Sequence, residues 1–181
     1  MKHILMILAL AMTLTVFGCA DSTTANNKKD ADDKAERNSW MSVELTDVRT
    51  GETFRISDFI GTPVLLETFA VWCSTCKKQQ DEIERLHDKL GDDVVSISVD
   101  TDPNEDRSKV KEHTERYGFN WRFAVDVDDF GRMLVDDFGV NVVNAPSAPV
   151  ILIDEKGHAE LLRFGVKKAD ELENTIEESR E

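Results

Sequence analysis

Cysteine is scarce in this chain: only Cys19, Cys73 and Cys76 are present among its 181 residues. A small exported domain that depends on disulfides for its stability carries more cysteines than this. The chain is also long enough to bury an apolar core without such cross-links. We therefore expect chemistry rather than scaffolding from the two cysteines that lie close together, Cys73 and Cys76.

Positive charge is also in short supply. Lysine and arginine number 22 against 36 aspartates and glutamates, which gives a formal net charge of −14 at pH 7. Removal of residues 1–18 would delete one positive charge, that of Lys2, and leave −15. So acidic a chain argues against a nucleic-acid partner and against electrostatic adhesion to anionic lipids.

The chain begins with an apolar run from Ile4 to Phe17 that follows a short positive start. This run is too short for an ordinary membrane-spanning helix and fits the apolar region of an export signal. Its end, Val16-Phe17-Gly18-Cys19, resembles the lipobox of bacterial and archaeal lipoproteins, in which the cysteine becomes lipid-modified. We expect residues 1–18 to be a lipoprotein signal peptide and Cys19 to be the lipidated residue. The alternatives are a plain secretory signal and an uncleaved anchor, and all three place the folded part outside the cytoplasm.

The next segment, Asp21 to Asn38, contains no large apolar residue. Such a composition cannot bury enough surface to offset the entropy lost on ordering, so residues 19–39 are predicted to be a flexible polar tether. The remaining residues, 40–181, have the length of one domain.

Within that domain, stretches with strand patterning alternate with amphipathic stretches, which indicates an α/β sheet covered by helices. The predicted strands are 41–48, 53–56, 64–70, 94–99, 121–125, 150–153 and 159–164. The predicted helices are 73–90, 105–117, 130–138 and 168–179. A hairpin-like turn at 49–52 joins the first two strands, and Val110 and Tyr117 are expected to point inward from their helix.

The motif Trp72-Cys73-Ser74-Thr75-Cys76 follows a buried strand and opens a helix, and it resembles the redox motif of thioredoxin. Together with the N-terminal hairpin, the export signal and the run Val95 to Asp100, it resembles the TlpA/ResA-like thiol–disulfide oxidoreductases, extracytoplasmic members of the thioredoxin superfamily. The resemblance covers residues 40–181. It implies a thioredoxin-like fold, with a central mixed β-sheet flanked by helices and an added N-terminal β-hairpin. It implies neither a small-molecule cofactor nor a metal.

The two cysteines are expected to have different roles. Cys73 lies at a helix N-terminus, where free N–H groups and the helix dipole stabilise a thiolate, so it should be the attacking sulfur. Cys76 lies one turn further on the apolar face and should be the resolving thiol. Trp72 is predicted to cover the site and contact the substrate, with ordinary core packing as the alternative. Ser74 and Thr75 complete the predicted contact surface and tune the redox potential.

Glu67 lies six residues before Cys73, in a strand that is otherwise mostly apolar. Burial of an ionised carboxylate is costly, so the pKa of Glu67 is expected to rise. Thioredoxin has a buried acid at the matching position, and the resemblance implies a proton acceptor for the resolving Cys76. The alternative is a side chain that reaches water at the strand end.

Pro149 precedes an apolar strand, as does the cis-proline that faces the cysteines in thioredoxin-like folds. A cis bond there would leave backbone groups free to pair with an extended substrate, with Ala148 supplying the contact. Pro146 is the competing candidate, but the spacing to Gly157 favours Pro149. The segment 141–147 looks longer than usual in the family and is expected to border the cysteines, with a simple surface insertion as the alternative.

Two departures from the family pattern leave the direction of electron flow open. Thr75 stands where these reductases usually carry proline, and Gln79 stands where many carry glutamate. The first hypothesis is a reductase of disulfides in exported proteins, supplied with electrons by a membrane thiol carrier. The second is an oxidant that uses the same site.

A third hypothesis is a non-catalytic copper-delivery lipoprotein. It is disfavoured because only two residues separate the cysteines and no histidine lies in the expected region. His87, His113 and His158 are instead predicted to be solvated, as are the acidic runs 100–102 and 126–129, which lack the spacing of a calcium loop.

Overall fold

The computed structural model of the chain describes residues 38–127 and 129–180. The predictions of a signal peptide at 1–18 and of a lipidated Cys19 lie outside the described residues, as does the predicted tether except for its last two residues. Within the described part of the chain, no helix combines the length and apolar character needed to cross a bilayer.

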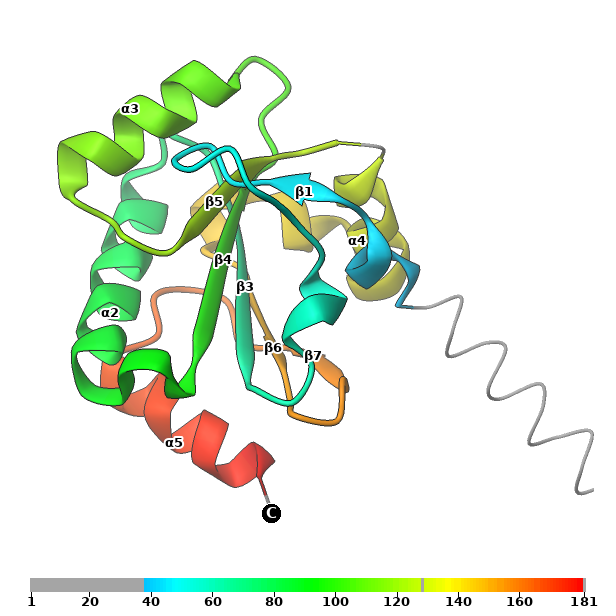
Figure 1. The fold of residues 1–181 in the computed structure, drawn as a ribbon, viewed down its shortest axis with the longest axis vertical. Coiled ribbons are helices and arrows are strands. Elements are labelled where there is room, and N and C mark those ends of the chain that lie inside the picture. Colours follow the sequence, from blue (N-terminus) through cyan, green and yellow to red (C-terminus); the bar gives the residue numbers. More distant parts are fainter. Residues whose placement is uncertain (1–37, 128, 181) are drawn as a thin grey trace, which may run out of the picture. The chain divides into compact units, whose positions relative to one another are not determined.

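A five-stranded sheet forms the centre of the fold, in the order β5-β4-β3-β6-β7 (Figure 1). Its strands are β3 (Val64–Phe69), β4 (Val95–Asp100), β5 (Arg122–Val125), β6 (Val150–Ile153) and β7 (Ala159–Leu161). Strands β3, β4 and β5 run parallel, whereas β6 is antiparallel to β3 and β7 is antiparallel to β6. All six residues of β3 are buried, as expected of a central strand covered on both faces. The predicted mixed sheet is confirmed.

Helices cover both faces of this sheet. They are α2 (Ser74–Leu90), α3 (Arg107–Tyr117), α4 (Phe130–Phe138) and α5 (Ala169–Ser179). Ile83 of α2, Val110 of α3 and Leu172 of α5 share one buried cluster with the β3 residues Leu65 and Phe69. The second cluster, on the opposite face, contains α4 and the N-terminal segment, and Figure 1 shows α2 and α4 on opposite sides of the sheet.

The expected N-terminal hairpin is present, with β1 (Leu45–Thr46) antiparallel to β2 (Thr53–Phe54). It is shorter than predicted, because Ser39–Ser42 forms the 3₁₀ helix η1 instead of a strand. The reason is Trp40, which is fully buried and packs edge-on against Phe130 and Phe138 of α4.

Short 3₁₀ helices make up several of the connections. These are η2 (Ile56–Phe59), η3 (Gly91–Asp93), η4 (Val140–Val143) and η5 (Ala145–Ser147). The last two occupy the segment that precedes β6, so this approach to the sheet is folded rather than extended.

Helix α3 ends at Tyr117 as predicted but begins two residues later than predicted. It begins at Arg107 because the Asp106 side chain caps it, accepting the N–H groups of Ser108 and Lys109 at 3.0 Å. Val110 is buried as expected, but the inward orientation of Tyr117 was wrong, since this residue is 42 % exposed. Its ring lies at the last turn under the Lys77 ammonium, 4.6 Å from the ring centroid.

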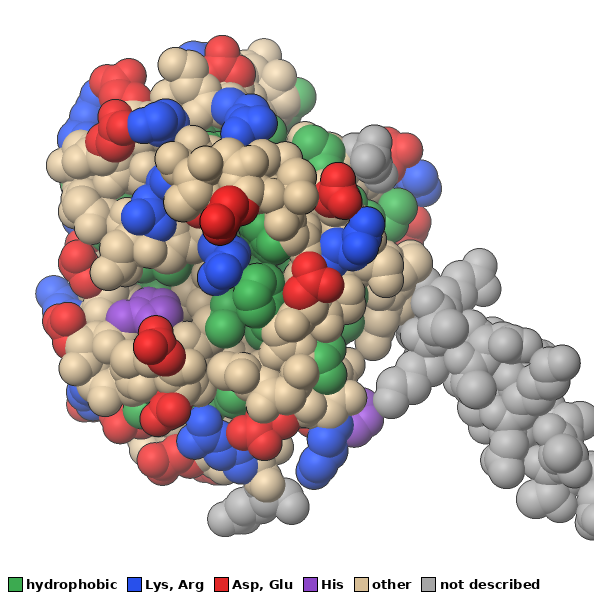
Figure 2. All heavy atoms as spheres, viewed as in Figure 1, with side chains coloured by type: hydrophobic (Ala, Val, Ile, Leu, Met, Phe, Trp, Pro, Cys, Tyr) green, Lys and Arg blue, Asp and Glu red, His purple; other side chains and the backbone are tan. Residues whose placement is uncertain are grey.

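Charged side chains of both signs are intermingled over the face shown in Figure 2. On this face the excess of acidic residues is spread out rather than gathered into one patch.

Candidate active site

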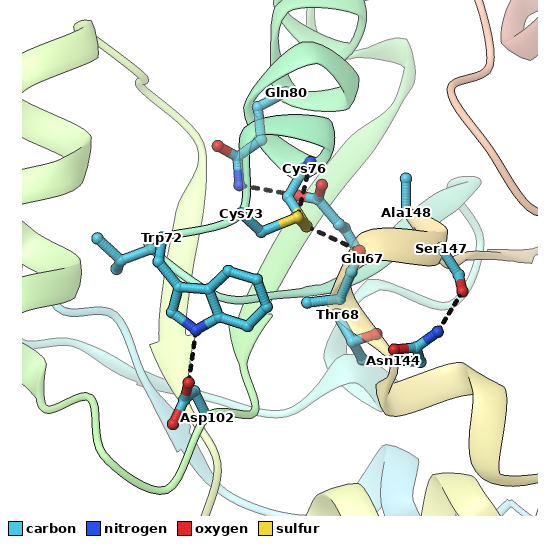
Figure 3. The surroundings of a disulfide bond; sticks show 12 residues. Glu67, Thr68, Trp72, Cys73, Cys76, Gln80, Asp102, Asn144, Ser147 and Ala148 are labelled. Atoms are coloured by element: carbon cyan, nitrogen blue, oxygen red, sulfur yellow. Dashed lines mark hydrogen bonds between the residues drawn. A yellow bond between two sulfur atoms is a disulfide. The ribbon is translucent and has the colours of Figure 1, made fainter.

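The two neighbouring cysteines lie where β3 gives way to α2. Cys73 is the N-cap of α2, and its sulfur is bonded to that of Cys76 with the two Cα atoms 5.3 Å apart. The Cys73 sulfur also accepts the backbone N–H of Cys76 at 3.1 Å (Figure 3). The first turn of the helix therefore offers a hydrogen bond to the sulfur on which a thiolate would form. Cys73 is 3 % exposed and Cys76 is fully buried.

The segment before β6 borders these sulfurs, as its length suggested. Cys76 Sγ lies 3.0 Å from the carbonyl oxygen of Ala145, which can accept a hydrogen bond from the Cys76 thiol when the pair is reduced. Thr68 Oγ1 donates to the carbonyl of Val142 and fixes the start of the same segment. Asn144 and Ser147 bond to each other at 2.6 Å on its outer side.

Trp72 lies beside the disulfide and is 61 % exposed, which rules out core packing. Its Nε1–H donates to Asp102 Oδ2 at 2.6 Å (Figure 3). The preceding residue is also held, since Val71 N–H donates to Glu105 Oε2 at 2.6 Å. Trp72 forms one wall of a hollow of about 260 Å³, which is otherwise lined by Ala70, Thr101, Asp102, Pro103, Val143, Asn144, Ala145 and Pro146. Between the two cysteines, Ser74 is exposed and Thr75 is half-buried.

Asp100 is the last residue of β4 and directly precedes Thr101 and Asp102, which line this hollow. The prediction that the run 100–102 is solvated was wrong for Asp100, which is 1 % exposed. Burial, and then the neighbouring carboxyl of Glu105, raise the pKa of Asp100 to about 8. Across the two described ranges, no three His, Cys, Asp or Glu side chains converge in a way that could hold a metal ion.

Glu67 is fully buried in the middle of β3, paired with Ser98 of β4 and Val150 of β6. Its Oε2 accepts hydrogen bonds from Ser98 Oγ at 2.7 Å and from Gln80 Nε2 at 3.1 Å. Burial raises the pKa of Glu67 to about 7, against the opposing effects of these two hydrogen bonds and of the positive charge of Lys167. The expected rise in pKa is confirmed, and the alternative of a side chain that reaches water is excluded.

A buried polar network continues from Glu67 through α2 to α3. Gln80 Oε1 lies 2.7 Å from His113 Nε2, and His113 is 3 % exposed. Burial lowers the pKa of His113 to about 4, so the ring is neutral at pH 7 and its Nε2–H donates to Gln80. On the other side, Trp121 Nε1 donates to Ser98 Oγ at 3.0 Å.

The surface position predicted for the histidines was therefore wrong at His113. The available signal was its spacing, since His113 follows the inward-facing Val110 by three residues and so shares its helix face. His87 is half-buried and stacks on Trp121, with the ring centroids 5.8 Å apart. His158 is exposed as expected.

The approach to Pro149 differs from the family-based expectation. No cis peptide bond is present among the described residues, so the predicted cis bond was wrong. Ala148 ends η5 in the left-handed region, with φ 45° and ψ 60°. Its N–H donates to Ala145 O at 2.8 Å, and its carbonyl accepts from Lys167 Nζ. Both backbone groups expected to contact a substrate are thus engaged inside the protein, because the preceding segment is coiled rather than extended.

The Redoxin family model matches residues 30–176 of this sequence. This chain belongs to the Redoxin family. Among similar curated proteins of known sequence, the thiol-disulfide oxidoreductase ResA of Geobacillus kaustophilus is 24 % identical over 136 residues, covering 74 % of this chain and 71 % of that protein. The thioredoxin-like protein YneN of Bacillus subtilis is 24 % identical over 131 residues, covering 71 % of each.

Solved structures agree on the fold of this Redoxin-family chain. A thiol:disulfide interchange protein of the thioredoxin family from Chlorobium tepidum superposes with a TM-score of 0.64 at 15 % identity, covering 76 % of this chain and 92 % of that one. The thioredoxin-like fold and the resemblance to TlpA/ResA-like thiol–disulfide oxidoreductases are confirmed.

Proposed function

We propose that this thiol–disulfide oxidoreductase works outside the cytoplasm as a reductase of disulfides in exported proteins, held to the membrane by a lipid on Cys19. The observation that carries the proposal is the Cys73–Cys76 pair at the N-terminus of α2, one helical turn before Gln80, which bonds the buried carboxyl of Glu67. The relatives named ResA support the chemistry, and the lipobox-like sequence before Cys19 supports the location.

In the first step the reduced protein attacks its partner. The Cys73 thiolate, stabilised by the N–H of Cys76, attacks one sulfur of the partner's disulfide. A Cys73–partner bond forms, the partner's sulfur–sulfur bond breaks, and the second partner sulfur leaves as a thiolate that takes up a proton. Trp72 and the hollow that it lines receive the polypeptide around the attacked disulfide. Ser74 and Thr75, between the two cysteines, add to the contact surface.

In the second step Cys76 releases the partner. The Cys76 thiol gives its proton to the Glu67 carboxylate, and the resulting thiolate attacks the Cys73 sulfur. The Cys73–Cys76 disulfide forms and the partner leaves as its second thiol, so two electrons pass from this chain to the partner. Figure 3 shows Glu67 beside the cysteines, and a pKa of about 7 suits a group that must both accept and release protons at neutral pH.

The reaction leaves the pair oxidised, so each cycle requires two electrons from outside. A dithiol on a membrane electron carrier is the class of donor that can supply them by the same exchange chemistry. Pro149 remains a candidate substrate contact at the start of β6, whereas the Ala148 backbone would first have to give up its internal hydrogen bonds.

Trapping of mixed disulfides tests the assignment. Cys76→Ala should accumulate covalent complexes with partner proteins on non-reducing gels, because the resolving thiol is missing. Cys73→Ala should accumulate few or none, because Cys76 is fully buried. Equal trapping by the two variants would contradict the roles assigned to the cysteines.

A further inference from the structure

Lys167 carries a side chain that is buried despite its charge, with 1 % of the residue exposed. It lies between β7 and α5, and its ammonium donates hydrogen bonds to the carbonyl of Ala148 and, at 3.3 Å, to that of Arg163. Burial of an ammonium is costly unless hydrogen bonds and an opposite charge compensate. The position of Lys167 therefore points to a negatively charged partner nearby.

Helix α2 fixes the backbone from which this side chain extends. Gln79 Oε1 accepts the N–H of Lys167 at 2.7 Å, and Gln79 Nε2 donates to its carbonyl at 3.2 Å. Glu82, one turn later, accepts the N–H of Ala169 at 3.1 Å. Because Gln79 follows Cys76 by three residues on the same helix, Lys167 is held in a fixed position relative to the cysteines.

The buried opposite charge on this side of the sheet is that of Glu67, which acts on Lys167 through space and not through a direct ion pair. Its strand partner Val150 lies two residues after Ala148, whose carbonyl holds the ammonium. The positive charge of Lys167 lowers the pKa of Glu67, and the Glu67 carboxylate raises the pKa of Lys167, which burial lowers to about 8. Glu67 Oε1 has no hydrogen-bond partner among the described residues, which leaves this oxygen to be compensated by charge.

Other charged groups act on this pair less directly. Arg163 lowers and Glu171 raises the pKa of Lys167, but these two side chains bond to each other at 2.5 Å and largely cancel. On the side of α2 and α3, Glu67 faces Gln80, and beyond it His113 is neutral at pH 7. The side chain that it faces on β4, Ser98, is uncharged.

We propose that Lys167 is a positioning residue of the cysteine site, whose buried ammonium is the counter-ion of Glu67 and holds the Ala148 carbonyl beside the segment that borders Cys76. This inference rests on the proposed role of Glu67 as the proton acceptor of Cys76. Together with the hydrogen bonds from Ser98 and Gln80, Lys167 favours the ionised form of Glu67, which can take the thiol proton.

Two substitutions test the proposal in the full chain. Lys167→Met removes the charge and the hydrogen bonds, and Lys167→Gln removes the charge but keeps a donor. We expect both to move the titration midpoint of the Glu67 carboxyl carbon, followed by NMR, about one pH unit upward. Resolution of a preformed mixed disulfide at pH 7 should slow about 5- to 10-fold and recover at higher pH. Lys167→Arg should restore most of the rate.

Lys168→Met is the matched control. The Lys168 side chain is exposed and its ammonium pairs with Glu82 at 2.9 Å, so its loss should change neither the midpoint nor the rate. An unchanged Glu67 midpoint in a folded Lys167→Gln protein would overturn the proposal. The proposal would also fail if Lys167→Met slowed resolution of the mixed disulfide by the same factor in a protein that already carries Glu67→Gln.

The same measurements separate this inference from the proposed function. If Glu67→Gln alone leaves the rate of resolution unchanged, the role of Glu67 as a proton acceptor fails. The carboxyl titration still decides whether Lys167 is its counter-ion. If Lys167→Met does not fold, Lys167→Gln carries the measurement.

Discussion

At the residue scale, Glu67 links the chemistry of the site to the stability of the fold. Burial raises its pKa from 4.5 to about 7, so the folded protein binds this proton more tightly than the unfolded chain does. Above pH 7 both states have lost the proton, and the folded state bears the cost of a buried carboxylate. The contribution of Glu67 to stability therefore falls as the pH rises from about 4.5 to about 7.

Glu67→Gln should remove this cost. Because one pKa unit corresponds to about 1.4 kcal/mol, we expect the free energy of unfolding at pH 8 to rise by about 1–3 kcal/mol, with little change at pH 4. Urea denaturation at both pH values measures the effect, with the exposed Glu160→Gln as control. An equal gain at pH 4 would show that packing, and not ionisation, is responsible.

The same variant should slow catalysis at one step only. Loss of the proton acceptor should slow resolution of the mixed disulfide by Cys76 about 10-fold or more and leave the initial attack by Cys73 unchanged. Rapid-mixing experiments that follow formation and decay of the mixed disulfide separate the two steps. Resolution at the wild-type rate would leave Glu67 with a structural role only.

At the element scale, the loop after β4 supports the loop that carries the cysteines. Asp102 accepts the indole N–H of Trp72, and Glu105 accepts the N–H of Val71, each at 2.6 Å. Two hydrogen bonds thus hold the exposed aromatic residue in place beyond the C-terminal end of β3. Since Trp72 would contact the substrate, this loop is expected to affect recognition rather than the chemical step.

Asp102→Ala tests this arrangement. The freed indole should rotate more easily, which lowers the anisotropy of Trp72 fluorescence. Attack on protein disulfides should slow about 2- to 10-fold, because orientation of the contact surface is lost, while attack on oxidised glutathione stays nearly unchanged. Asp136→Ala, an exposed acid on α4, is the control. Equal slowing towards both substrates would indicate a change at Cys73 itself.

The elements differ in how far the sequence predicts them. The helix over 73–90 and the strand over 64–70 were placed within one residue, because a mostly apolar run and a regular helical face are local signals. The coiling of 141–147 and the left-handed Ala148 were not foreseen, since tertiary contacts from Thr68 and Lys167 fix them.

The candidate site likewise has a part that local sequence predicts and a part that only the fold reveals. The cysteine motif and the unusual position of Glu67 could be found in one short stretch of sequence. The polar network around Glu67 could not, because its partners Gln80, Ser98 and His113 come from three further elements that only the fold brings together.

At the scale of the whole molecule, the location of the protein is the proposal that needs its own test. The described part of the chain supplies the redox domain, and the membrane attachment proposed for it depends on Cys19. The full chain expressed in bacteria should partition into the detergent phase, and Cys19→Ala should move it to the aqueous phase. A Cys19→Ala protein that stays in the membrane would contradict lipid anchoring.

The reduction potential of the Cys73–Cys76 pair tests the central claim most directly. It can be measured on the full chain by equilibration with glutathione or dithiothreitol buffers. A reductase should give a value near or below roughly −220 mV, on the thioredoxin and glutaredoxin side of the scale. A value near roughly −120 mV would make the protein a disulfide donor instead and contradict the account.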